Sequence, residues 1–404
     1  MAAALVLGLG AGFVLAILIP LAAATPSWGS RLPRLIQAHG WIQLQGFVGL
    51  FVAGMALIPR LCGRRPLPAA LVLTLLVLLA SGAVLRLFGQ VILQGRPGNL
   101  ALLLAGALAA AGMLGTAASL ALALARSSRR GQGWRASAWA AVAWWMVWAA
   151  LTVATAVRAS GQNGLVPANL DRSATWVVLL GAIGNLVWTV QVGSVPVFYG
   201  RRPPVGPRLL VPILLFYLGL FIVLASPAAA IAEVLLVRRS GLALTGAAML
   251  WLAPLYGAVR GSAHRLHAAS QPAAGFLVMA NRWAMLAGCL LLAAAAITVS
   301  SSGLEIADGL EDAAQHAIGL GLVTTLVVGM ARLLTPVFAI GRTQASPSVL
   351  LIRLIWLGLS VATALRVLAA VIRTMLPLAG GICCSRSPAC WPGSRSLSLP
   401  PASS

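Results

Sequence analysis

Lysine is absent from this chain of 404 residues, and acidic residues number only six. Charged residues make up 8% of the composition, whereas 60% is hydrophobic and the mean hydropathy is +0.97. A water-soluble domain cannot hide that much apolar surface, so the composition excludes a soluble globular protein. The 28 basic residues are all arginines, and they lie mostly between apolar runs. That placement is typical of arginines that orient membrane helices and touch anionic lipid, and it excludes nucleic acid as a partner.

Cysteine is scarce, and its spacing excludes a cysteine-based metal site. The five cysteines are Cys62, Cys289, Cys383, Cys384 and Cys390. No paired C-x-x-C motif occurs, and we infer no disulfide framework.

Long apolar runs dominate what is present. Runs of about 20 residues predict membrane-spanning helices. We find eleven of them, at 2–24, 36–58, 67–90, 98–125, 135–157, 173–199, 208–232, 241–260, 273–298, 312–340 and 348–373. The sequence therefore predicts an all-α, polytopic membrane helix bundle with the lipid bilayer as its surroundings. The first run lacks a basic leader, so we interpret it as a span and not as a signal peptide.

The distribution of arginine between the spans predicts the orientation. The loops after the even-numbered spans hold thirteen arginines, and those after the odd-numbered spans hold seven. The positive-inside rule then places the N-terminus in the cytoplasm of a prokaryotic inner membrane. The acidic segment "SSGLEIADGLED" becomes an outer loop under this interpretation.

Spans two, six and ten resemble one another. Gly54, Gly193 and Gly329 recur at nearly equal intervals, each followed by a proline within a few residues. This pattern predicts three four-helix units, at about 1–125, 135–260 and 273–380, within one transmembrane domain over 1–380. Twelve spans would then be expected and eleven are present. The composition changes abruptly at 381–404, which predicts either a frameshifted segment or a disordered tail.

Two histidines are the candidate ligands of a cofactor. His39 and His316 lie near the starts of spans two and ten, both at the predicted outer side. Two imidazoles at matched depth on separate helices can ligate a haem iron from both faces. An interfacial histidine bonded to water or backbone is the alternative for each one alone.

Residues near the two histidines suit a flat macrocycle. Gln43 and Gly46 share the His39 face of span two, and Gly319 lies beside His316. Small residues admit a porphyrin but serve plain helix packing equally well.

Arginines near the predicted outer side are candidate partners for haem propionates. They are Arg86 on span three and Arg366 and Arg373 on span eleven. Snorkelling to lipid phosphate is the alternative, and we favour it for Arg373. The remaining histidines, His264 and His267, have metal-site spacing but no third ligand nearby, so we interpret them as loop residues.

The segments "AQHAIGLGLVTTLVVGMARLLTPVF" and "HGWIQLQGFVGLFVAGMALIPR" resemble NnrS-type membrane proteins, a family related to the catalytic subunit of haem-copper oxidases. The resemblance extends to about residue 380. It implies a twelve-helix bundle, a haem b held by His39 and His316, propionates anchored by Arg366 or Arg373, and a role in the response to nitric oxide.

The chain also departs from the family pattern. Trp41 stands where a second ligand-type residue is frequent, and spans six and seven lack the histidines that bind copper in the oxidases. These departures argue against a copper centre and against terminal oxidase activity. The first hypothesis is therefore a haem protein in nitric-oxide response or membrane electron transfer, with a membrane or periplasmic redox partner. The second is a cofactor-free transporter or permease, with a path lined by Asn185, Thr189, Gln191 and Ser194. The third is a haem-free membrane scaffold.

Overall fold

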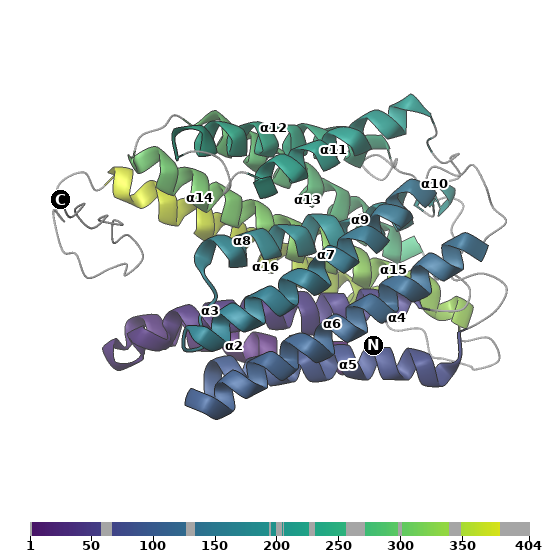
Figure 1. The fold of residues 1–404 in the computed structure, drawn as a ribbon. Coiled ribbons are helices and arrows are strands. Elements are labelled where there is room, and N and C mark those ends of the chain that lie inside the picture. Colours follow the sequence, from purple (N-terminus) through teal and green to yellow (C-terminus); the bar gives the residue numbers. More distant parts are fainter. Residues whose placement is uncertain are drawn as a thin grey trace, which may run out of the picture.

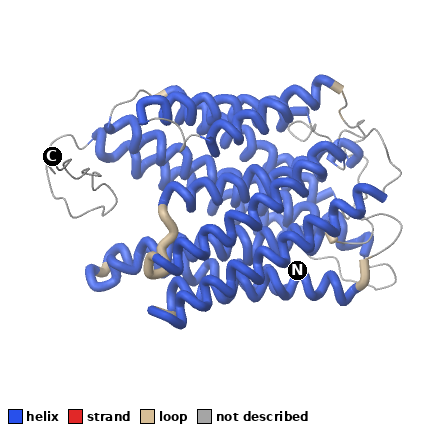
Figure 2. The backbone as a smooth tube through the Cα atoms, in the orientation of Figure 1, coloured by secondary structure: helices blue, strands red, loops and turns tan. Residues whose placement is uncertain are grey.

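Every apolar run found in the sequence corresponds to a helical stretch of the protein. The computed structural model describes residues 2–57, 67–126, 134–193, 195–198, 204, 206–225, 231–255, 271–297, 301–338 and 349–379. Within these ranges the chain forms helices joined by short turns and contains no strand (Figure 2). The predicted all-α bundle is therefore confirmed for the part of the chain that is described.

The helices have the following bounds. They are α1 (Ala2–Leu5), η1 (Val6–Gly12), α2 (Phe13–Ala24), η2 (Pro26–Arg31), α3 (Leu32–Trp41), η3 (Ile42–Gly49), α4 (Leu50–Ala56), α5 (Ala69–Leu87), η4 (Phe88–Ile92), α6 (Gly95–Arg126), α7 (Trp134–Gly161), α8 (Ala168–Trp176), η5 (Val177–Ile183), α9 (Gly184–Gly193), α10 (Val195–Phe198), α11 (Pro207–Ala225), α12 (Ile231–Leu255), α13 (Gln271–Ala296), α14 (Ser301–His316), η8 (Ala317–Thr324), α15 (Thr325–Phe338) and α16 (Val349–Ala379).

The length and composition of these helices make the chain an integral membrane protein. Nine helical stretches among the described residues are long and apolar enough to cross a membrane. The other two predicted spans are also helical, as the continuous stretch from α3 to α4 and as α12. The long helices run roughly side by side (Figure 1), as they do in a polytopic bundle.

Apolar side chains occupy both the inside and the outside of the bundle. Trp145, Trp148 and Trp176 are fully buried, whereas Leu214 and Leu350 are largely exposed. An exposed leucine is favourable here because lipid tails are as apolar as the core. Helices that follow one another in the chain pack together, notably α5 on α6, α6 on α7, α11 on α12 and α12 on α13.

Five π-helical segments interrupt the α-helices of the described residues. Three of them, η3, η5 and η8, lie within predicted spans two, six and ten, the spans that carry the internal similarity. A π-helical turn disturbs the regular backbone hydrogen bonds and is frequent at functional sites. The predicted repeat stays a prediction, but a shared backbone irregularity now accompanies the shared glycines.

The charged segments near helix ends differ from the prediction. The prediction of an acidic outer loop at "SSGLEIADGLED" is wrong, because α14 begins at Ser301 and continues through this segment as a helix. Arg238 and Arg239 likewise lie within α12 and not in a loop. The physical reason is pairing: Arg238 forms a two-bond ion pair with Glu311 of α14, so both charges are satisfied on helices.

Helix α14 binds its neighbours through its acidic residues. The pairs are Arg172 of α8 with Asp308, Arg238 of α12 with Glu311, and Arg366 of α16 with Asp312. The histidine pair His264 and His267, the tail 381–404, Ser194 and the side chain of Arg373 lie outside the described residues.

Candidate functional site

His39 is held by the backbone of the first helix. Its Nδ1 lies 2.9 Å from the carbonyl oxygen of Gly12, the last residue of η1. Because a carbonyl oxygen only accepts, Nδ1 carries the hydrogen and donates it. Among the described residues, no hydrogen-bond partner contacts Nε2 of His39. The lone pair of that nitrogen is therefore free to bind.

His316 has the same arrangement at the end of α14. Its Nδ1 donates to the carbonyl oxygen of Asp312, one turn earlier, at 2.7 Å. Its Nε2 accepts a hydrogen bond from Nε of Arg366 on α16 at 3.1 Å. An arginine can only donate, so this contact requires a lone pair on Nε2 and fixes the neutral, Nδ1-protonated imidazole.

The structure brings the two histidines to the same region. The segments that follow them, η3 and η8, contact each other. Helices α3, α8 and α14 begin at the same end of the bundle (Figure 1). His39 also lies close enough to Arg366 for the guanidinium charge to act on it. Two imidazoles and one guanidinium from three helices thus form a polar cluster, which we call the histidine cluster.

The other residues predicted to lie beside the two histidines, Gln43, Gly46 and Gly319, pack between helices. Gln43 donates through Nε2 to the carbonyl oxygen of Gly8 on η1 at 3.3 Å. A Cβ on Gly46 would lie 3.4 Å from Cβ of Leu7, also on η1. Gly319 is more open, with a side-chain atom of Leu179 3.7 Å from where a Cβ would be. Gln43 and Gly46 therefore fasten span two to span one, whereas a methyl group at Gly319 would make ordinary contact with Leu179.

Arg86 stands apart from the histidine cluster. Its guanidinium carbon lies 3.7 Å from the centre of the Trp41 ring, and NH1 donates to Oγ1 of Thr155 at 3.1 Å. The residue is 3% exposed, and within the described part of the chain its Nε and NH2 have no hydrogen-bond partner. Its contacts are thus with spans two and five, and none of those described joins it to His39 or His316.

Sequence reasoning missed the role of Trp41 and Asp171. Nε1 of Trp41 donates to Oδ1 of Asp171 at 2.9 Å, so the indole lies between a buried cation and a carboxylate. Asp171 is 130 positions from Trp41, a separation that no local pattern reveals. The available signal was the cost of burying Arg86, which demands a counter-charge somewhere in the bundle.

A second polar group lies in α9, within the residues predicted to line a transport path. Tyr217 of α11 donates to Oδ1 of Asn185, and Thr189 donates to the carbonyl oxygen of Asn185 at 2.7 Å. Gln191 is fully buried, and neither the oxygen nor the nitrogen of its amide has a hydrogen-bond partner in the described ranges.

Two further observations concern a possible metal-ion site and the relatives of the chain. No group of three or more histidine, cysteine, aspartate or glutamate residues that could hold a metal ion occurs in the described ranges. Comparisons of the chain with protein-family models, with curated proteins and with solved structures give no match. The NnrS resemblance therefore stays a prediction from the motifs of spans two and ten.

Proposed function

We propose that the chain is an integral membrane protein that binds one haem b through His39 and His316, in the manner that its NnrS resemblance implies. The observation that supports the proposal is the matched pair of imidazoles. Each donates its Nδ1 hydrogen to a backbone carbonyl and keeps its lone pair on Nε2. Metal-bound histidines characteristically use one nitrogen for such an orienting bond and the other for the metal.

Haem binding by this pair of histidines requires a rearrangement. His39 has no partner at Nε2 among the described residues, and Gly319 presents no side chain beside His316. Arg366 contacts Nε2 of His316 and must release it before that nitrogen can bind iron. Arg366, the cation of the histidine cluster, would then be available to a propionate, whereas Arg86 is occupied by Trp41 and Thr155.

A bound haem would supply one-electron redox chemistry in the membrane, which suits either nitric-oxide response or electron transfer to a membrane or periplasmic partner. The protein contributes the two imidazoles, their orienting carbonyls and the arginine. No copper is included, because spans six and seven offer no histidine.

The test is a reduced-minus-oxidised absorption spectrum of the purified protein. We expect a sharp low-spin b-type signal in the wild type that both His39→Ala and His316→Ala abolish. His267→Ala is the control, since it removes an imidazole to which the resemblance gives no haem role. A wild-type protein that stays colourless after expression with added haem, or a signal that survives both variants, would overturn the proposal.

The buried Gln191 favours a transporter as the second candidate. An amide with neither atom paired is costly unless water or a solute reaches it. In a chain whose native cysteines are replaced by serine, Gln191→Cys should react with a membrane-impermeant maleimide if a path exists. Ile183→Cys, on a fully buried apolar position, is the control. Equal protection of both sites would exclude the path.

We also propose that the N-terminus faces the cytoplasm of a prokaryotic cell, from the arginine distribution between the spans. In the same cysteine-free background, Asn163→Cys should be labelled in intact cells and Arg208→Cys only after lysis. The reverse pattern would invert the orientation.

A further inference from the structure

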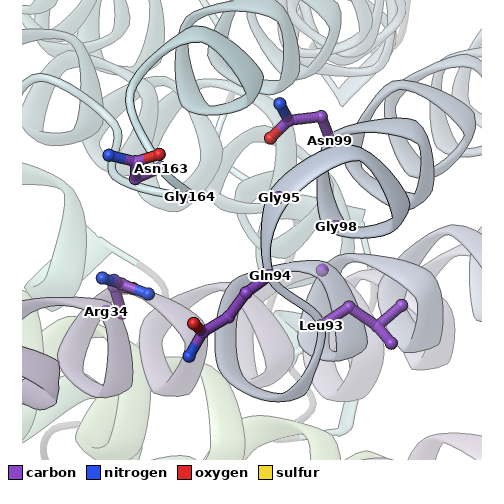
Figure 3. Close-up of a pocket in the computed structure, with 9 residues that line it drawn as sticks. Arg34, Leu93, Gln94, Gly95, Gly98, Asn99, Asn163 and Gly164 are labelled. Carbon is purple, nitrogen blue, oxygen red and sulfur yellow. The ribbon is translucent and has the colours of Figure 1, made fainter.

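A pocket of about 280 Å³ opens at the end of the bundle where α3 and α6 begin. Roughly 10–15 Å³ of such space suffices for one water molecule, so the pocket has room for a ligand of several atoms. Its polar lining consists of Arg34 from α3, Gln94 just before α6, Asn99 from the first turns of α6 and Asn163 from the turn between α7 and α8. Figure 3 shows these four side chains around one opening, with those of Arg34 and Gln94 pointing toward one another.

The lining is rich in hydrogen-bond donors and carries a single charge. Arg34 is the one ionisable residue among the residues that line the pocket, and no carboxylate lines it. Nε of Arg34 is buried and has no hydrogen-bond partner among the residues that the structure describes. Three carboxamides add NH₂ groups, and the first N–H groups of a helix as long as α6 have no partner within the helix. The pocket therefore offers a guanidinium edge, amide donors and backbone donors to one occupant.

The walls of the pocket are held in place by buried bonds. Nε2 of Gln90, a residue that is 1% exposed, donates to the carbonyl oxygen of Gly164 at 3.2 Å. Gln37 binds both the N–H and the carbonyl oxygen of Val166, at 3.0 and 2.7 Å. Asn163 and Gly164 both have positive φ, 51° and 85°, which turns the chain sharply at the mouth of the pocket. The backbone around the pocket is thus fixed before a ligand arrives, which lowers the entropic cost of binding.

From these observations we infer that this pocket is a binding site for a phosphate group, either free inorganic phosphate or the headgroup phosphate of an anionic lipid. A phosphate presents several acceptor oxygens and a negative charge, which match a guanidinium edge and a helix N-terminus. The site is separate from the histidine cluster and does not depend on whether the protein binds haem.

The variants that test this inference differ in charge but little in shape. Arg34→Gln removes the only cation of the pocket. Asn163→Asp keeps the size of the side chain and tolerates the positive φ, but it places a carboxylate opposite the ligand. Arg31→Gln is the matched control, because Arg31 carries the same charge three residues earlier, does not line the pocket and lies over the ring of Trp28. Thermal unfolding curves of all three variants establish that each is folded.

The first measurement is titration calorimetry of the delipidated, detergent-solubilised protein with inorganic phosphate. We expect saturable binding that Arg34→Gln and Asn163→Asp each weaken by about tenfold or more, as for the loss of a charge-assisted bond. Arg31→Gln should bind as the wild type does. This result supports the inference with a soluble source of phosphate.

The second measurement is native mass spectrometry of protein released from nanodiscs of phosphatidylglycerol. Retention of one lipid by the wild type and by Arg31→Gln, with loss in Arg34→Gln and Asn163→Asp, supports the inference with a lipid source even if free phosphate does not bind. If neither probe binds, the inference is overturned. If Arg31→Gln reduces binding as much as Arg34→Gln does, the general charge of the surface explains the binding, and the inference is overturned as well.

Discussion

Nε of Arg366 donates a hydrogen bond to Nε2 of His316 across 3.1 Å, joining α16 to the end of α14. The same guanidinium reaches Oδ2 of Asp312 at 3.4 Å. Arg366 therefore covers the one nitrogen of His316 that could bind a metal. The corresponding nitrogen of His39 has no such cover among the described residues. The two imidazoles share the hydrogen bond from Nδ1 to a backbone carbonyl, but only Nε2 of His39 is uncovered among the described residues.

That difference predicts the chemical reactivity of the two histidines in the haem-free protein. Diethyl pyrocarbonate attacks an imidazole nitrogen through its lone pair, so the capped His316 should react more slowly than it does in Arg366→Gln. We expect the variant to raise the rate at His316 by about fivefold, which corresponds to the roughly 1 kcal/mol of one hydrogen bond. Mass spectrometry of peptides measures the rate at each site. Arg353→Gln, an exposed arginine of the same helix, is the control, and an equal effect there would refute the capping role.

The burial of Arg86 predicts that a second substitution can restore stability lost at Asp171. Asp171→Asn keeps the acceptor for Trp41 but removes the negative charge that faces Arg86 across the indole. We expect it to lower the free energy of unfolding by about 2 kcal/mol, because a buried cation loses its counter-charge. Arg86→Met together with Asp171→Asn should recover most of this loss, since Met fills a similar volume on the Trp41 ring. Thermal unfolding in detergent measures both, and a double variant less stable than Asp171→Asn would contradict the coupling.

The ion pairs of α14 should differ sharply in their contribution to the free energy of unfolding. The Arg238–Glu311 pair has side chains that are 18% and 5% exposed, whereas those of Arg172 and Asp308 are 40% and 54% exposed. Glu311→Gln should therefore lower the free energy of unfolding by about 3 kcal/mol, because it leaves the partly buried guanidinium of Arg238 without a counter-charge. Asp308→Asn, the matched control, should cost less than about 1 kcal/mol and be sensitive to salt. Similar losses for the two variants would show that burial does not decide their strength.

A close contact between α12 and α13 depends on two glycines. A Cβ on Gly246 would lie 2.7 Å from the carbonyl oxygen of Gly288, and one on Gly288 would lie 2.9 Å from that of Gly246. Either glycine changed to Ala should separate α12 from α13 and lower the melting temperature, because backbone atoms cannot give way as a side chain can. Gly358→Ala on α16 meets nothing within 4 Å and should be neutral or slightly stabilising. A neutral result at Gly246 and Gly288 would mean that the helices do not approach this closely.

The amino-acid sequence alone determined the class of the protein and the positions of its spans. Runs of about 20 apolar residues have few stable alternatives to a membrane helix, because backbone polar groups in lipid must be paired within the segment. The same logic singled out His39, His316 and Arg86, since ionisable groups in such runs are costly. It failed at Glu311 and Arg238, where two charges that look like loop residues pair with each other between helices.

Only the tertiary structure decided which polar residues meet. It joined Trp41 to Asp171, His316 to Arg366, and Arg34 to the turn at Asn163, over separations that carry no periodic signal. It also showed that the face shared by His39, Gln43 and Gly46 meets the first helix, which their common spacing did not reveal. Helical periodicity tells which residues share a face, but what that face contacts depends on how α3, α14 and α16 pack, and packing is a property of the whole chain.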